Sequence, residues 1–247
     1  MSELFCYKWD LRGQLADFAV DLEYAAKLDL LGDFTTLLHV TCLPLDGEQA
    51  AFSKRELRKL TDVQERCTAL LGKAGAFVGR IDVGAQRRLY YYTSDAKLLL
   101  ALNNFCAKES AFALSCTRVN EPNRQTYYRL LYPNAAKFQG KRNEEFIEIM
   151  RSRGDDLASM RRINLHLLFA GAPAMNAFAA EAKTAGFAIG NTGFIPERET
   201  PHTLSVHAVS RLEWEELTKL TTEAITIAER CGGTFGYVDS AFVEKRF

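Results

Sequence analysis

The sequence predicts an α+β protein built from two tandem units, each with its strands and helices in the order β-α-β-β-α-β. A length of 247 residues suits two domains of roughly 100–130 residues better than one. Hydrophobic residues make up 47% of the chain and charged residues 25%, a composition typical of folded proteins. The same succession of strand-like and helix-like apolar patterns then occurs twice along the chain.

A predicted hairpin precedes the first repeat. Residues 4–10 and 14–23 have the composition of strands, and Arg12-Gly13 between them favours a turn. The compact apolar run at residues 37–43 is the first strand of the repeat, because Pro44 cannot continue a central ladder. We therefore expect the first unit to carry an extra N-terminal β-hairpin.

The remaining elements of the first unit follow in order. Ser53 and Glu56 form a capping-box pattern, and apolar residues then recur every three or four positions as far as Gly72, which predicts a helix. A second helix is expected after Ser94-Asp95. The expected strands around these helices are residues 76–82, 87–93 and 112–119.

The second half repeats the order. Residues 134–154 predict a mostly polar connecting helix between a first domain at 1–133 and a second at 155–247. Pro173 stands at a favoured first helical position, and Ser210 with Glu213 forms another capping-box pattern for a helix that ends at Gly232-Gly233. The expected strands are residues 161–169, 187–194, 203–209 and 234–243.

This order of elements is the split β-α-β pattern of ferredoxin-like folds, so we expect two tandem ferredoxin-like domains with antiparallel sheets. Each sheet would end in edge strands with unpaired backbone groups. A homodimer formed by sheet extension or by face packing therefore stays open.

The charge balance and the cysteines bound the setting. The 31 basic and 31 acidic residues cancel, which argues against direct binding of nucleic acid or of an anionic membrane. No run approaches the roughly 20 apolar residues of a membrane span, and the first residues lack the pattern of a signal peptide. The six cysteines are scattered singly, which favours a cytoplasmic protein with reduced thiols.

No catalytic, cofactor-binding or metal-binding pattern stands out. The chain has no phosphate-binding glycine loop, and His202 and His207, five residues apart, would point to opposite faces of one strand. His39 and His166 each lie in the first strand of a unit, and we interpret both as half-buried histidines with hydrogen-bonding partners. A hydrolase that uses either of them is the remote alternative.

The aromatic strand at residues 87–93 is the candidate binding surface. Alternation places Tyr90 and Tyr92 on one sheet face, next to Arg87 and Arg88, and Tyr91 on the other. If that face is open, its rings could stack on bases or hold a small ligand. The alternative is a face that packs on a hairpin, the other domain or a second subunit.

The second half resembles a known family. Gly154-Asp155-Asp156-Leu157 is followed by Arg161 and by a strand with His166 and Phe169, and Gly186-Phe187 and Gly232-Gly233 with Phe235 follow later. In these motifs the chain resembles the regulator of ribonuclease E activity B family. The resemblance implies a non-enzymatic cytoplasmic protein that binds an endoribonuclease, or another protein partner, and dampens RNA decay.

The first half resembles the domain of unknown function 695, which is often fused to the regulator domain. The resemblance rests on the early hairpin, the strand that ends at Pro44, the run Phe77-Val78-Gly79-Arg80 and the aromatic strand that reaches Tyr92. From both halves the sequence favours an interaction protein. A ligand- or RNA-binding module that uses the Tyr90–Tyr92 face is the alternative.

Overall fold

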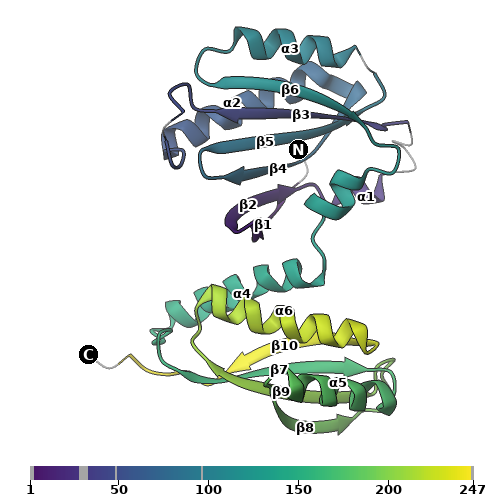
Figure 1. Cartoon of the computed structure of the whole chain (residues 1–247). Coiled ribbons are helices and arrows are strands. Elements are labelled where there is room, and N and C mark those ends of the chain that lie inside the picture. Colours follow the sequence, from purple (N-terminus) through teal and green to yellow (C-terminus); the bar gives the residue numbers. More distant parts are fainter. Residues whose placement is uncertain (1–2, 28–32, 48, 96, 246–247) are drawn as a thin grey trace. The chain divides into compact units, whose positions relative to one another are not determined.

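The computed structural model describes residues 3–27, 33–47, 49–95 and 97–245 (Figure 1). The chain divides into two compact units, residues 1–133 and 134–247. Each has one antiparallel sheet with helices, of six strands in the first unit and four in the second. The α+β class is therefore as predicted. Within the described ranges, no helix is both long and apolar enough to cross a membrane.

The first unit has its strands in the order β1-β2-β4-β5-β3-β6. The hairpin β1-β2 thus extends, beside β4, the sheet formed by the four strands of the repeat. Its elements are β1 (Phe5–Leu11), β2 (Gln14–Val20), α1 (Glu23–Ala26), β3 (Thr36–Leu43), α2 (Lys54–Leu71), β4 (Gly75–Val83), β5 (Gln86–Thr93), α3 (Leu98–Lys108), β6 (Ala113–Asn120) and a π-helical segment (Thr126–Leu131).

Local sequence determines two of these elements directly. Arg12 and Gly13, with φ of 58° and 84°, form the two-residue turn of the hairpin, and this left-handed pair matches the twist of the flanking strands. At the start of α2, the Ser53 hydroxyl accepts from the Glu56 N–H, and the Glu56 carboxylate accepts from the Ser53 N–H at 2.8 Å. The predicted hairpin and capping box are both confirmed.

Both faces of the first sheet are covered. On one face, α2 and α3 bury an aliphatic core that includes Leu38, Leu60 and Leu102. On the other face, side chains from β1, β2, α1 and the π-helical segment surround an aromatic core that includes Tyr24 and Tyr127. The second covering layer is assembled from segments that are far apart in the sequence.

The second unit has the strand order β10-β7-β9-β8, all antiparallel. Side chains of α4, α5 and α6 share one core with every second residue of β7, among them Ile163, Leu165 and Leu167. The elements are α4 (Ala135–Ser152), β7 (Arg161–Phe169), α5 (Ala172–Thr184), β8 (Ala188–Phe194), β9 (His202–Ser210), α6 (Trp214–Arg230) and β10 (Gly233–Ser240).

The sequence predicted a connecting helix at 134–154 between the two domains, but the structure places this helix within the second unit. α4 packs along α6 in the second unit (Figure 1), where Asn143 is fully buried and donates to the Thr221 hydroxyl at 2.9 Å. The Trp214 indole of α6 donates to the Gly140 carbonyl at 3.1 Å. These contacts make α4 part of the second unit, whose boundary falls after Pro133.

The second predicted capping box is wrong. Ser210 is the last residue of β9, paired with Arg161, and α6 begins four residues later at Trp214. The Ser210 hydroxyl and the Arg211 N–H both donate to the Glu216 carboxylate, at 2.7 and 3.0 Å. Pairing within the sheet therefore takes precedence over the local helix-start pattern.

Candidate functional site

The predicted aromatic surface of the first unit is buried. Tyr90 is 4% exposed, and Tyr91 and Tyr92 are fully buried. Tyr92 stacks on Tyr24, with ring centroids 5.7 Å apart, and its hydroxyl donates to Glu121 at 2.7 Å. Because α1 and the hairpin contribute to the same core, the alternative of a face packed on a hairpin is the correct one, and this face is not open to bases or small ligands.

The two arginines beside these tyrosines differ in environment. Arg87 is 3% exposed and donates two hydrogen bonds of 2.6 Å to the Asp82 carboxylate. Arg88 is half-buried near His39, whose pKa is lowered first by burial and then by the charge of Arg88. His39 itself contacts the Thr117 hydroxyl, as expected for a half-buried histidine with a partner. None of these residues forms an open site.

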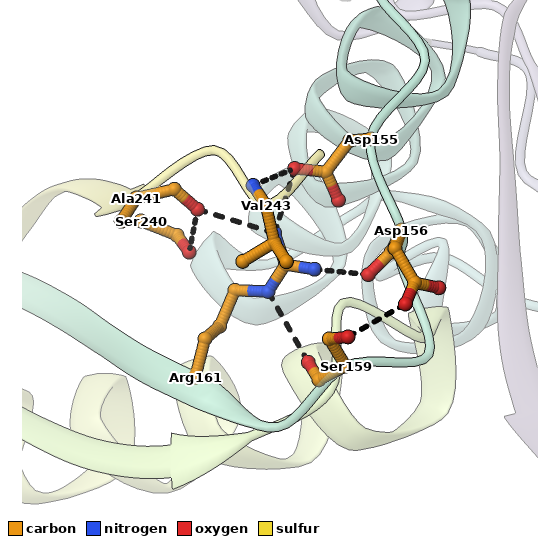
Figure 2. Close-up of polar contacts among 7 residues, drawn as sticks. All are labelled: Asp155, Asp156, Ser159, Arg161, Ser240, Ala241 and Val243. Atoms are coloured by element: carbon orange, nitrogen blue, oxygen red, sulfur yellow. Dashed lines mark hydrogen bonds and ion pairs between the residues drawn. The ribbon is translucent and has the colours of Figure 1, made fainter. Parts of the chain in front are cut away.

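The family-motif residues Asp155, Asp156 and Arg161 form a hydrogen-bonded cluster, which we call the clip (Figure 2). The Arg161 guanidinium, 3% exposed, donates to the fully buried Asp155 carboxylate at 2.7 Å. It also donates to the carbonyls of Ser159 and Ala241, at 3.2 and 3.1 Å, and to that of Asp156. A buried arginine with this many fixed acceptors holds structure together, and it offers nothing to a partner.

The clip joins the segment between α4 and β7 to the chain beyond β10. The Asp155 carboxylate also accepts from the Val243 N–H at 2.9 Å, and Asp155 and Glu244 form an isolated bridge. Figure 2 shows Val243 beside Asp155, in the segment that precedes β7, and the Ala241 carbonyl bonded to the Arg161 side chain. The motif therefore fixes the chain beyond β10 to the start of the sheet.

The paired glycines and Phe235 are structural as well. Gly232 has a φ of 76° after α6, and a Cβ on Gly233 would lie 2.2 Å from the Phe169 ring. Phe235 packs against the core, and a bulge between Phe235 and Tyr237 then turns Tyr237 to the other face. A bulge of this kind re-aims a side chain without breaking the strand.

The side of the second sheet opposite its helices is exposed or half-buried. Alternate residues of β7 point to it, and their neighbours on β10 and β9 join them across the sheet. We call this surface the open face. It comprises Arg162, Asn164, His166, Ser205, His207, Val209, Tyr237 and Asp239.

One hydrogen-bonded chain runs along the open face. Asp239 accepts from the Asn164 amide at 2.7 Å and contacts His166 Nε2 at 2.6 Å. The Asn164 carbonyl oxygen accepts from Arg162 Nε, also at 2.7 Å. The Tyr237 ring stacks on His166, with centroids 4.1 Å apart and planes 12° apart. Each side chain in this hydrogen-bonded row is thereby held in place by its neighbour.

His207 lies beside this chain, opposite Asn164 on β9. The pKa of His207 is lowered, first by burial and then by the positive charge of Arg162. Neutral imidazole is therefore the favoured form of this residue, and the field of Arg162 reaches across to the next strand.

The geometry does not favour a hydrolase. His166 has a carboxylate partner in Asp239, but this pair lies on a sheet face, where Asp239 is 48% exposed. A catalytic pair is normally enclosed in a pocket that excludes water. The two described cavities of this unit, of about 570 and 370 Å³, are lined by other residues, between α5 and α6 and between α4, α6 and β10. Within the described residues, no group of three or more histidine, cysteine or acidic side chains could hold a metal ion.

Sequence reasoning found His166 but missed the rest of the open face. The alternation of Arg162, Asn164 and His166 with apolar residues is visible in the sequence and marks one solvent-facing strand face. The position of Tyr237 and Asp239 opposite them depends on the bulge at Gly236, which the sequence pattern does not reveal.

Residues 141–236 match the model of a protein family described as Regulator of ribonuclease activity B. The match begins within α4 and ends in β10, so it spans most of the second unit. No curated protein matches the chain. The resemblance expected for the C-terminal half is thus confirmed, and the family concerned is regulatory rather than catalytic. The resemblance of the first half to the domain of unknown function 695 stays a prediction.

Proposed function

We propose that this protein is a non-enzymatic cytoplasmic regulator that binds an endoribonuclease and slows RNA decay. The observation that carries the proposal is the match of residues 141–236 to a family of ribonuclease regulators. That stretch contains most of α4, all of α5, α6, β7, β8 and β9, and the start of β10, whereas Tyr237 and Asp239 of the open face follow directly after it.

The open face has the properties of a protein-binding surface. Tyr237 is 58% exposed, and its ring is fixed against His166. Exposed tyrosines of fixed orientation carry much of the binding energy of protein interfaces, because little conformational freedom is lost when a partner covers them. The polar chain around Asp239 supplies donors and acceptors of defined direction.

Both units fit the ferredoxin-like interpretation. If the strands of each repeat are numbered in chain order, both sheets read 4-1-3-2, the order of the split β-α-β fold, and the first adds the hairpin β1-β2 beside its second strand. We also propose that the first unit belongs to the domain of unknown function 695 family. The edge strands β6 and β8 leave room for a homodimer, which the mass of the protein in solution would decide.

Binding is tested with the full chain and a purified endoribonuclease from the same cell. We expect the two to co-elute in gel filtration and Tyr237→Ala to weaken binding about 30-fold, the effect of a hot spot worth about 2 kcal/mol. The matched control is Tyr128→Ala, which removes a 43% exposed tyrosine of the first unit and should leave binding unchanged. No co-elution of the wild-type chain would contradict the proposal.

A further inference from the structure

Arg162 is a cation held in a fixed orientation by an uncharged partner. The Asn164 amide directs its NH₂ to Asp239 at 2.7 Å, so its carbonyl oxygen must point the other way, where it accepts from Arg162 Nε. Asp239 therefore orients Arg162 through Asn164 without a direct ion pair. A guanidinium positioned in advance loses less freedom when it binds a ligand.

The charge of Arg162 is not neutralised within the described residues. No ion pair there includes Arg162, and both Asp239 oxygens are occupied, one by Asn164 and the other by His166. The side chain is exposed, and the bond it makes in the described part of the chain uses Nε. The two terminal nitrogens form a fork whose spacing matches the two oxygens of a carboxylate.

We infer that Arg162 anchors an acidic side chain, Asp or Glu, of a polypeptide bound across the open face. The inference rests on the proposed function and specifies the chemistry of its partner. Val209 lies directly opposite Arg162 on β9 and is 65% exposed. Tyr237 pairs with His166, four residues further along β7, or about 13 Å at the rise of a strand. The partner segment thus carries a carboxylate beside one apolar group and a second apolar or aromatic group about 13 Å away.

The surroundings favour a polypeptide over RNA. Asp239, 48% exposed, would face the phosphates of a nucleic acid laid along the same strands. Residues 134–247 contain 14 basic and 15 acidic side chains, so the unit lacks the positive field that binds a phosphate backbone. A single carboxylate next to apolar side chains meets neither obstacle.

The test selects short random peptides displayed on phage against the immobilised full chain. We expect the enriched peptides to carry Asp or Glu close to an apolar residue. Their affinity for Arg162→Gln should fall about ten- to hundred-fold, as for the loss of a charged hydrogen-bonded contact. Arg162→Lys should bind with intermediate affinity, because lysine keeps the charge but not the fork. Arg198→Gln, which removes an exposed charge from the loop between β8 and β9, is the matched control and should bind like wild type.

Four results would overturn the inference: no peptide is enriched, the enriched peptides lack acidic residues, Arg162→Gln binds them like wild type, or polyuridylic acid displaces them. All three variants are first checked for an unchanged circular dichroism spectrum. The endoribonuclease experiment distinguishes a failure of this inference from a failure of the proposed function. If the nuclease binds the wild type and Arg162→Gln equally, only this inference is refuted. If acidic peptides bind the chain but the nuclease fails to bind it, only the proposed function is refuted.

Discussion

Replacing Arg161 by methionine should destabilise the second unit more than any exposed substitution in β7. The change leaves the Asp155 carboxylate, 0% exposed, without its cation, and it removes donors from three backbone carbonyls. Removing one partner of a buried ion pair costs about 3–5 kcal/mol. Whole domains are stable by only about 5–15 kcal/mol, so the loss would be a large fraction of the total.

The two tryptophans allow this loss to be measured in the correct unit. Trp9 lies in the first unit and Trp214 in the second, so the fluorescence of a Trp9→Phe chain follows only the second unit during urea unfolding. With a slope of about 2 kcal/mol per molar urea, a loss of 4 kcal/mol lowers the midpoint by about 2 M.

The control for this experiment is the neighbouring residue. Arg162→Met removes an exposed arginine from the same strand and should change the free energy of unfolding by less than about 1 kcal/mol. The double variant Asp155→Leu with Arg161→Met should recover part of the loss, because no buried charge remains unpaired. If Arg161→Met shifts the midpoint no more than Arg162→Met does, the clip does not hold the unit together.

Three further predictions use the same unfolding assay or a thiol titration. Gly233→Ala should destabilise the second unit by about 1–3 kcal/mol, because its Cβ would overlap the Phe169 ring. The control Gly171→Ala, whose Cβ would have its nearest neighbour at 3.5 Å, should be tolerated. Equal effects of the two substitutions would contradict an overlap at Gly233. In a Trp214→Phe chain, whose fluorescence follows the first unit, the free energy of unfolding should fall as the pH drops below about 6.5. The reason is that burial lowers the pKa of His39 in the folded state, so the unfolded chain binds the proton more tightly. The same pH dependence in a chain that also carries His39→Gln would refute this prediction. In the folded protein at pH 8, the exposed Cys6 should react rapidly with a thiol reagent while Cys42, whose pKa burial raises to about 12, reacts only on unfolding; rapid reaction of Cys42 would show that the core opens.

Local patterns were enough to predict the elements whose cause is local. The turn at Arg12-Gly13 and the capping box at Ser53 depend on residues within four positions of each other, and both form as expected. The same pattern failed at Ser210, because that residue pairs with Arg161 about fifty positions earlier in the chain. A capping-box pattern in a sequence carries no information about such pairing.

At the candidate binding surface around Tyr90 and Tyr92, too, local features could be predicted and long-range ones could not. Alternation placed Tyr90 and Tyr92 on one face and Tyr91 on the other, in agreement with the two separate cores of the first unit. Whether this face is exposed could not be predicted, because the layer over Tyr90 and Tyr92 comes from segments before β3 and after β6. In the second unit, the strand alternation of Arg162 and His166 could be read from the sequence, but the contacts of His166 with Asp239 and Tyr237 on β10 depend on long-range register.

Regulation through the open face can be measured as the rate at which a purified endoribonuclease from the same cell cleaves a labelled RNA in the presence of the full chain. We predict that the wild-type protein lowers the rate in proportion to the nuclease bound, and that Tyr237→Ala requires about 30-fold more protein for the same inhibition. An unchanged cleavage rate at saturating wild-type protein, or equal inhibition by Tyr237→Ala, would contradict a regulator that acts through the open face.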